Sequence, residues 1–417
     1  MRPASVVLVM GASGFIGRRV VHRLERAGTR VVCAGRDEAG LRRCFPGRTT
    51  ATDWKTALAN VDAVVYAAGT IERGPGMWDV HRNTPTALFA AARRQGIPRL
   101  IHLSALGAAP DADTEFLRSK GQGDAALLAD RPPGWTVLRP SLVYGRGGTS
   151  AALFATLAAL PLRPSVQSGP LRPIHVDDLA AAAAALLTTP APLPPVVDAV
   201  GPEEVTAEAF IARHRDWLGL PPARTLPLPL AAMQAGAALA EAFGAHLVSR
   251  EAMRMLARGA ATDPVGFTAT TGVVPVGIAA GLAREPALEA DRWAARLRPV
   301  RLPLRLSLAF LWIATGLVSL GIYPVADSLD LLAGVGLRDG PALTALYGAA
   351  GWDLALGTAL AAGVRPHLVG ALQIGTILTF TVILSLFLPG FWVHPFGPLT
   401  KNVPVIAATL AMMALED

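Results

Sequence analysis

The feature of this sequence that most constrains its fold is a C-terminal segment almost without charge. From Leu306 to Asp417 the only basic residues are Arg338, Arg365 and Lys401. Between the charges lie four apolar stretches, at 306–323, 341–364, 366–392 and 399–415. A helix needs about 20 mostly apolar residues to cross a bilayer, and only the fourth stretch is slightly short. Because a backbone cannot end unsatisfied inside lipid, we predict an all-α bundle of four transmembrane helices over residues 303–417.

Composition and charge agree with a membrane protein. The chain is 52% hydrophobic and 17% charged, whereas soluble domains carry about 25% charged residues. Arginines cluster just before the first predicted span, at positions 292, 296, 298, 301 and 305. By the positive-inside rule we expect the preceding residues to be cytoplasmic, at the cell's inner (plasma) membrane. The other arginines are scattered, which does not indicate a nucleic-acid partner.

The first 300 residues alternate between strand-like and helix-like patterns. Strands are expected at 6–9, 30–34, 63–67, 100–103 and 136–138, and helices at 18–27, 84–95, 121–129 and 181–187. This alternation predicts an α/β fold, a doubly wound parallel sheet of the Rossmann type, over residues 1–300.

A glycine-rich turn joins the first predicted strand to the first predicted helix. It runs Gly11-Ala12-Ser13-Gly14-Phe15-Ile16-Gly17. Glycines allow a tight turn and let backbone N–H groups approach a pyrophosphate, which the helix N-terminus then favours electrostatically. In this strand–turn–helix setting the pattern predicts a nicotinamide dinucleotide site.

The choice of dinucleotide is predicted from the end of the second strand, where Gly35-Arg36-Asp37 follows. An arginine there accommodates the 2′-phosphate of NADP, whereas a carboxylate on the ribose favours NAD. Arg36 comes first, so we expect NADP, with NAD as the alternative.

Several motifs together resemble atypical short-chain dehydrogenases/reductases, in the branch of the complex I NADPH-binding accessory subunit and nucleoside-diphosphate-sugar epimerase-like proteins. They are the glycine-rich turn, Arg36, Asp53, 66–69, Asn83, 102–107, 138–145 and 173–178. The resemblance implies that Ser13–Ile16 wrap the pyrophosphate, that Asp53 lies near the adenine, and that Ala67 and Ala68 flank its ribose. We also place Pro140 in the cofactor site.

Active members of that superfamily use a Tyr-x-x-x-Lys pair on one helix and a serine from the preceding strand. The matching stretch here is Phe116-Leu117-Arg118-Ser119-Lys120, so the lysine is present and the tyrosine is phenylalanine. Phenylalanine has no proton to give. We expect Lys120 to contact the ribose, and Ser104 to be either a catalytic helper or a polar wall residue. Tyr144 is a weaker candidate for the proton donor.

Three further segments have simpler interpretations. In His175-Val176-Asp177-Asp178 we expect Asp177 to cap the following helix and His175 to end a strand, not a metal site. No cluster has metal-ligand spacing, so no metal is expected. Residues 219–230 form a proline-rich connection, and 231–248 a helix that either packs on the nucleotide domain or lies at the membrane interface.

The C-terminal segment resembles the DoxX-like family of four-helix membrane domains. The residues that carry this are Trp312 and Gly316, Trp352-Asp353, and 394–402. Asp353 lies within a predicted span and should therefore face the bundle and find a partner. Candidates are Arg305, Lys401, Thr376 and Thr379. Asp353 then either lines a polar site for a quinone headgroup or proton, or is a structural hydrogen-bonding group.

Two functions remain open. One is a membrane-tethered NAD(P)-dependent oxidoreductase or epimerase acting on a lipid-soluble substrate such as a quinone. The other is a non-catalytic NADP(H)-binding sensor or assembly factor of a membrane complex. Phe116 favours the second, while Lys120 and the membrane segment favour the first.

Overall fold

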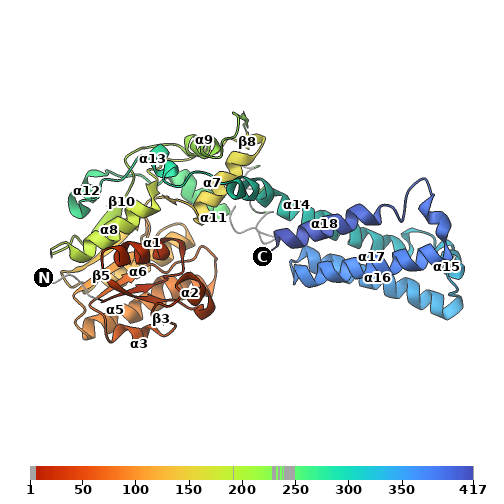
Figure 1. Cartoon of the computed structure of the whole chain (residues 1–417), viewed down its shortest axis with the longest axis horizontal. Helices are drawn as coiled ribbons and strands as arrows, with labels where there is room; N and C mark the ends of the chain where they lie inside the picture. Colours follow the sequence, from red (N-terminus) through yellow and green to blue (C-terminus); the bar gives the residue numbers. More distant parts are fainter. Residues whose placement is uncertain are drawn as a thin grey trace. The chain divides into compact units, whose positions relative to one another are not determined.

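In this computed structural model, residues 6–190, 192–227 and 249–416 are described, together with residues 232, 235, 236 and 238. The chain divides into two compact units. One consists of Met1–Ala238 with His246–Arg292, and the other of Leu239–Ala245 with Trp293–Asp417. Figure 1 shows the sheet and its helices in the first unit and long helices in the second.

The first unit is built on a parallel sheet of seven strands. In spatial order they are β10 (Val196–Ala199), β6 (Trp135–Pro140), β5 (Arg99–Leu103), β4 (Ala63–Tyr66), β1 (Val6–Met10), β2 (Arg30–Ala34) and β3 (Thr50–Ala51). The order reverses between β1 and β4, and ligands of such sheets bind outside the carboxyl ends of the strands at that point. The predicted doubly wound α/β fold is confirmed.

Helices cover both faces because successive side chains of each buried strand point to opposite sides. Val7 and Val9 of β1 pack with α1 (Phe15–Arg26) and α8 (Val176–Thr188). Leu8 packs on the other side, in the cluster that holds α5 (Thr84–Arg94), α3 (Trp54–Leu58) and the end of α6 (Glu115–Leu128). Figure 1 shows this layering. α6 begins at Glu115, six residues before the predicted start, because Thr114 caps it by accepting from Leu117 N.

Smaller elements extend the first unit beyond the sheet. They are α2 (Glu38–Cys44), α4 (Pro75–Trp78), η1 (Asp79–Asn83), β7 (Val143–Tyr144), α7 (Thr149–Ala159), β8 (Leu162–Pro164), β9 (Ile174–His175), α9 (Ala207–Trp217), β11 (Arg224–Leu226), α11 (Arg250–Arg258), α12 (Val265–Thr271) and α13 (Ile278–Ala283). The proline-rich 219–230 connection therefore contains a short strand, β11, which pairs with β8. The helix predicted over 231–248 falls almost wholly outside the described residues.

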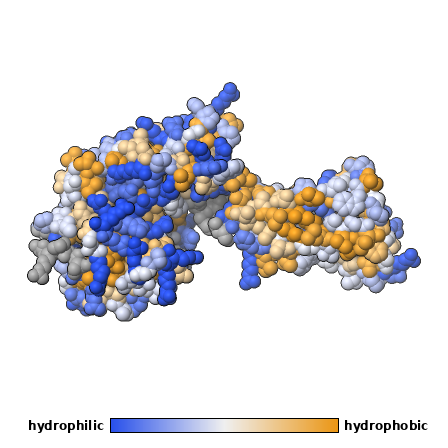
Figure 2. All heavy atoms as spheres, in the orientation of Figure 1, coloured by the Kyte–Doolittle hydropathy of each residue, from blue (hydrophilic) through white to orange (hydrophobic). Residues whose placement is uncertain are grey.

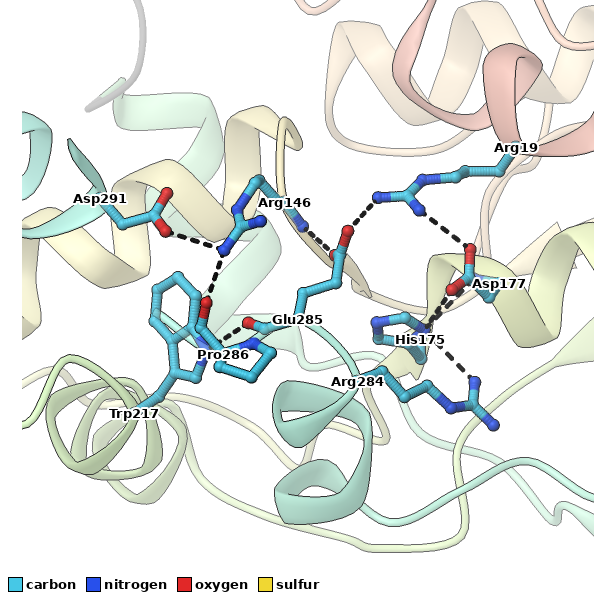
Figure 3. Close-up of polar contacts among 9 residues, drawn as sticks. All are labelled: Arg19, Arg146, His175, Asp177, Trp217, Arg284, Glu285, Pro286 and Asp291. Carbon is cyan, nitrogen blue, oxygen red and sulfur yellow. Dashed lines mark hydrogen bonds and ion pairs between the residues drawn. The ribbon is translucent and has the colours of Figure 1, made fainter. Parts of the chain in front are cut away.

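A polar network fixes the end of the first unit, as Figure 3 shows. The Glu285 carboxylate accepts hydrogen bonds from the Arg19 side chain and from Arg146 N. Burial alone would raise the pKa of Glu285, but these two donors outweigh it and lower the pKa below its ordinary value. Trp217 Nε1 donates to Glu285 O at 2.8 Å, and the Arg146 side chain pairs with Asp291 at 3.0 Å. The network joins α1, the turn after β7 and α9 to the segment from Glu285 to Asp291.

The prediction that Asp177 caps α8 is wrong. The helix begins one residue earlier, at Val176, and the ring of His175 accepts the hydrogen bond from Asp177 N at 3.3 Å. Asp177 lies in the first turn instead, where its carboxylate lies 3.4 Å from Arg19. A carboxylate there is favoured by the helix dipole.

The second unit is helical. Its helices are α14 (Glu289–Leu317), which belongs to this unit from Trp293 on, η2 (Val318–Ile322), α15 (Val325–Gly334), α16 (Asp339–Ala361), α17 (Pro366–Phe387), η3 (Pro389–Trp392) and α18 (Asn402–Leu415). Among the described residues, two helices, Glu289–Ile322 and Pro366–Phe387, are long and apolar enough to cross a membrane by length and composition. Much of this unit's visible surface is hydrophobic in Figure 2.

These helices differ in detail from the predicted spans. The first is continuous with the arginine-rich segment before it, since α14 starts at Glu289 and contains Pro299 and Pro303. The third ends at Phe387, where Leu388 leaves helical geometry before Pro389. The fourth begins at Asn402, and α15 was not predicted. That all four helices span the bilayer stays a prediction.

Candidate functional site

The glycine-rich turn lies at the switch point of the sheet. Gly11 follows β1 with φ +74°, and its N–H donates to Ala34 O at the end of β2 at 2.8 Å. A Cβ on Gly11 would lie 2.7 Å from the Cα and N of Ala68, just after β4. A Cβ on Gly17 would lie 2.9 Å from Gly11 C. Only glycine therefore permits this conformation and this close packing of turn, strand and helix.

The first helix starts in the turn without a side-chain cap. Gly14 is the N-cap residue of α1, and no acidic residue occupies the first turn. The N–H groups at this end and the positive end of the helix dipole suit an anion such as a diphosphate. Ser13, Phe15 and Ile16 lie in the turn and first helical positions and are half-buried. Their contact with a pyrophosphate stays a prediction.

Arg36 and Asp37 follow β2 but are not equivalent. The Asp37 carboxylate caps α2 by accepting a hydrogen bond from Gly40 N at 3.0 Å. Arg36 is exposed two residues beyond the strand. The acidic side chain is thus engaged in the helix cap, whereas the guanidinium is available to a phosphate at this edge.

Asp53 and the two alanines flank the same edge of the sheet. Asp53 caps α3, accepting from Lys55 N at 3.0 Å and from the Thr56 hydroxyl at 2.6 Å. The hydrogen bond from Thr56 lowers the pKa of this carboxylate. Ala67 and Ala68 follow β4, and Ala67 N donates to Met10 O at 2.9 Å. All three are therefore placed beyond strand ends, where the resemblance predicts the adenosine half.

Lys120 is buried beneath the carboxyl ends of β4 and β5. Its Nζ donates to Leu103 O at 3.0 Å and to Ala68 O at 3.4 Å. Only 5% of the residue is exposed. Burial lowers the pKa of Lys120 to about 8, partly offset by the charge of Asp124 one turn along α6.

Ser104 and Phe116 face a common cavity. Ser104 follows β5, and its backbone N–H donates to Leu138 O at 2.9 Å. Its Oγ is buried and has no hydrogen-bond partner within the described ranges. Phe116 lies one helical turn before Lys120 and packs edge-on against His81, with ring centroids 5.4 Å apart. The arrangement retains a serine hydroxyl and a lysine but offers no phenol.

The cavity has a volume of about 360 Å³ and is mainly apolar. Phe15 and Ile16 of the glycine-rich turn line it, as does Pro140 at the end of β6. Ser104 and Phe116 lie on its wall, and the rest comes largely from α7, α11 and the segments after β5 and β6. Among the described residues that line it, Arg258 is the one that carries a charge. The predicted cofactor turn and the predicted catalytic stretch therefore open onto one space, which suits an uncharged, apolar molecule.

Two residues near this cavity were missed from the sequence. Glu251 of α11 accepts a hydrogen bond from Phe116 N at 2.9 Å, which holds α11 over the start of α6. His81 contacts Ser119 Oγ at 2.8 Å and accepts from Thr70 N at 3.1 Å. Burial lowers the pKa of His81 to about 2, so its ring is neutral. Neither residue belongs to a local motif. Glu251 is 135 positions from Phe116, and His81 is 38 positions from Ser119.

Tyr144 does not face the cavity. It is fully buried and lies against His175 and Phe210 with edge-to-face rings. Its hydroxyl is directed at Gly281 of α13, where a Cβ would clash with it. Burial raises the pKa of Tyr144 above its ordinary value. These contacts disfavour a role as proton donor.

Comparisons with known proteins agree with both halves of this architecture. Residues 7–198 match the NAD dependent epimerase/dehydratase family, and residues 309–410 match the DoxX-like family. The chain joins an epimerase-like short-chain dehydrogenase/reductase domain to a DoxX-like domain. Nicotinamide dinucleotide binding by the first domain is thus supported by its family.

Individual relatives match less than half of the chain. The chain is 30% identical over 192 residues to the Mus musculus protein "NADH dehydrogenase [ubiquinone] 1 alpha subcomplex subunit 9, mitochondrial", covering 42% of this chain and 51% of that protein. It is 31% identical over 197 residues to a ceramide reductase of Caulobacter vibrioides, covering 44% and 62% respectively. The chain thus spans about half to three-fifths of these relatives.

Among solved structures, the UDP-glucose 4-epimerase of Thermus thermophilus in complex with NAD has the same fold. The TM-score is 0.50 at 21% identity, with 66% of this chain and 96% of that chain covered.

Proposed function

We propose that the first domain is an NADP(H)-dependent oxidoreductase that acts on an uncharged, lipid-soluble substrate. One observation carries the proposal: the mainly apolar cavity of about 360 Å³ is lined both by the glycine-rich turn and by Ser104 and Phe116. A nicotinamide ring held from that turn would face this cavity. Charged sugar nucleotides fit such a wall poorly, because its described residues offer their phosphates a single arginine.

The cofactor would be held by groups that the fold already positions. The N–H groups of Gly11–Gly17 and the α1 dipole would bind the diphosphate, and Ala67, Ala68, Asp53 and Pro140 would surround the rest. We favour NADP because Arg36 is exposed, while Asp37 is used as the cap of α2. When bound, the nicotinamide supplies or accepts a hydride.

The chain's own groups would orient the substrate and provide charge. The unpartnered Ser104 hydroxyl is able to donate to a carbonyl oxygen at the cavity wall. Lys120, held by Leu103 O and Ala68 O, would contact the ribose hydroxyls and stabilise negative charge nearby. Phe116 transfers no proton, so a quinone-like substrate that needs no protein acid is favoured over one that requires a phenol.

A second candidate is a non-catalytic NADP(H)-binding sensor or assembly factor. Phe116 supports it, as does the similarity to a subunit of a mitochondrial NADH dehydrogenase. The similarity to a ceramide reductase supports the catalytic candidate and an apolar substrate. In either case we place the nucleotide domain on the cytoplasmic side of the plasma membrane, because arginines precede the first span.

The two candidates are separated by mixing the full chain in detergent with NADPH and a panel of alkyl-benzoquinones and long-chain ketones. The catalytic candidate predicts loss of NADPH absorbance with at least one class. Leu153→Trp, which fills the cavity, should abolish that loss while NADPH still binds, whereas Leu157→Trp, one turn along α7 and not lining the cavity, should not. NADPH that binds but is never oxidised would support the sensor.

A further inference from the structure

Among the described residues of the DoxX-like match, 309–410, three polar side chains are buried with atoms that have no hydrogen-bond partner. Trp312 on α14, Asp353 on α16 and Gln373 on α17 are 7%, 7% and 0% exposed. Within the described part of the chain, nothing bonds Trp312 Nε1, Asp353 Oδ1 or either amide atom of Gln373. Each unsatisfied buried group destabilises the fold, and lipid offers no water to relieve it. Three such groups in one bundle therefore need a common explanation.

The packing of α14 against α16 places Trp312 and Asp353 at the same depth in the bundle. A Cβ on Gly316 would lie 2.8 Å from Ala350 O, and the two helices run antiparallel. Trp312 is one turn before Gly316, and Asp353 is one turn after Ala350. Because the helices are antiparallel, one turn back along α14 and one turn forward along α16 lead in the same direction through the bundle. Trp312 and Asp353 therefore project from facing helices at the same depth.

Gln373 joins them from α17. Trp352 Nε1 donates to Thr376 Oγ1 at 3.0 Å. Thr376 of α17 therefore lies at about the same depth in the bundle as Trp352 of α16, the residue before Asp353. Gln373 lies one turn before Thr376 and shares the buried face of α17 with Gly370 and Ile377. The three groups thus come from three helices within about one turn of one another.

None of the predicted partners satisfies Asp353. Arg305 pairs with Glu416 at 3.5 Å and lies near Gly363, ten residues and about 15 Å along α16 from Asp353. Thr376 accepts from Trp352, Thr379 donates to Gly375 O, and Lys401 is exposed.

The surroundings of the three groups are apolar. The cluster inside the bundle consists of residues such as Leu308, Leu356, Ile377 and Met412. An anionic ligand would lose its hydration there without gaining a counter-ion, because the one ionisable group among the three is a carboxylate.

We propose that Trp312, Asp353 and Gln373 form a binding site for the uncharged headgroup of a membrane-dissolved molecule that bears carbonyl or hydroxyl oxygens. Trp312 Nε1 and Gln373 Nε2 donate to a carbonyl or hydroxyl oxygen, and Asp353 Oδ1 and Gln373 Oε1 accept from a hydroxyl. The apolar tail of the ligand remains among the bundle side chains and lipid. This site is separate from the nucleotide domain and does not depend on its activity.

The test uses the full chain in phosphatidylcholine nanodiscs and follows tryptophan fluorescence during titration with decyl-benzoquinone, a quencher. A saturable component is expected, and Trp312→Phe should remove it. Trp392→Phe, an exposed tryptophan of η3 that is not among the site residues, should keep it. Dioctanoylglycerol is then added as a competitor: its displacement of the quinone points to a glycerolipid, and failure to displace it points to a quinone. Both outcomes support the proposed chemistry.

Leucine variants separate a ligand site from a structural network. Asp353→Leu and Gln373→Leu should weaken the saturable component about tenfold or more, while Asp353→Asn, which keeps an acceptor, should weaken it less. Because an unpartnered polar group is a cost, the leucine variants should melt at the wild-type temperature or above. The proposal is overturned if no saturable component exists, if the leucine variants leave it unchanged, or if they lower the melting temperature without affecting it.

Discussion

Lys120 Nζ donates to Leu103 O at 3.0 Å, directly beneath the strand end that leads into Ser104. The contact places an ammonium in a buried position, where its pKa falls from 10.5 to about 8. In the unfolded chain the pKa stays near its ordinary value. Two pH dependences of opposite sign follow from this one residue.

NADPH affinity should decrease as the pH rises through about 8, because the Lys120 charge that would contact the ribose is then lost. The stability of the first domain should change in the other direction. Between pH 8 and 10.5 the unfolded chain binds the proton that the folded chain has released, so stability rises with pH over this window. Lys120→Met should remove both trends. Calorimetric titration and thermal melting across about pH 7–10 measure them, and a pH-independent affinity in the wild type would rule out the ribose contact.

Phe116→Tyr should introduce a phenol at the cavity wall, one turn before Lys120. A positioned general acid contributes about 10²–10⁴-fold, so we expect a gain of at least tenfold in NADPH-dependent reduction of a bound ketone. Phe116→Leu is the matched control, since it changes the cavity wall without adding a hydroxyl that can donate a proton. Steady-state rates of the three proteins provide the comparison; equal rates would mean that this wall does not face the reacting carbonyl.

Gly11→Ala should abolish nucleotide binding and destabilise the first domain. Its φ is +74°, and the new Cβ would lie 2.7 Å from Ala68. Gly47 is a matched control, because its φ is +73° but nothing lies within 4 Å of an added Cβ. Gly47→Ala should cost only the backbone strain, about 1–2 kcal/mol, and leave NADPH affinity unchanged. Denaturant unfolding and calorimetry separate the two effects, and retained affinity in Gly11→Ala would exclude the turn as the diphosphate site.

Arg36→Ala should weaken NADPH about tenfold or more and leave NADH nearly unchanged, because only NADPH carries the 2′-phosphate. Arg42→Ala, an exposed residue of α2 that pairs with Glu38 at 2.7 Å, should change neither. Parallel titrations with both cofactors measure the ratio. A wild-type protein that prefers NADH would contradict the assignment to NADP.

The sheet was predictable because its determinants are local. Val7, Leu8 and Val9 alternate between two buried faces, and Gly11 follows directly after the strand ends at Met10, so strand, turn and helix follow from neighbouring residues. The cavity was not predictable in the same way. Its wall depends on α11, whose Glu251 bonds Phe116 N across 135 positions, and no local spacing encodes that contact.

The cap of α8 and the interior of the helical bundle were also not fully predictable from local sequence. The ring of His175 caps α8, a position usually filled by a short polar side chain, so the prediction of Asp177 followed residue preference and missed the contact. The sequence alone shows that Asp353 is an unusual carboxylate within an apolar span. That it lies at the same depth as Trp312 and Gln373 depends on how three helices pack. Tertiary packing, which determines both cases, is the information that a local pattern lacks.

The most direct test of the account is a calorimetric titration of the full chain with NADPH. The account predicts saturable 1:1 binding, with a Kd on the order of micromolar, that Gly11→Ala abolishes and Gly47→Ala retains. No heat of binding with either NADPH or NADH, from a protein that melts cooperatively, would contradict it.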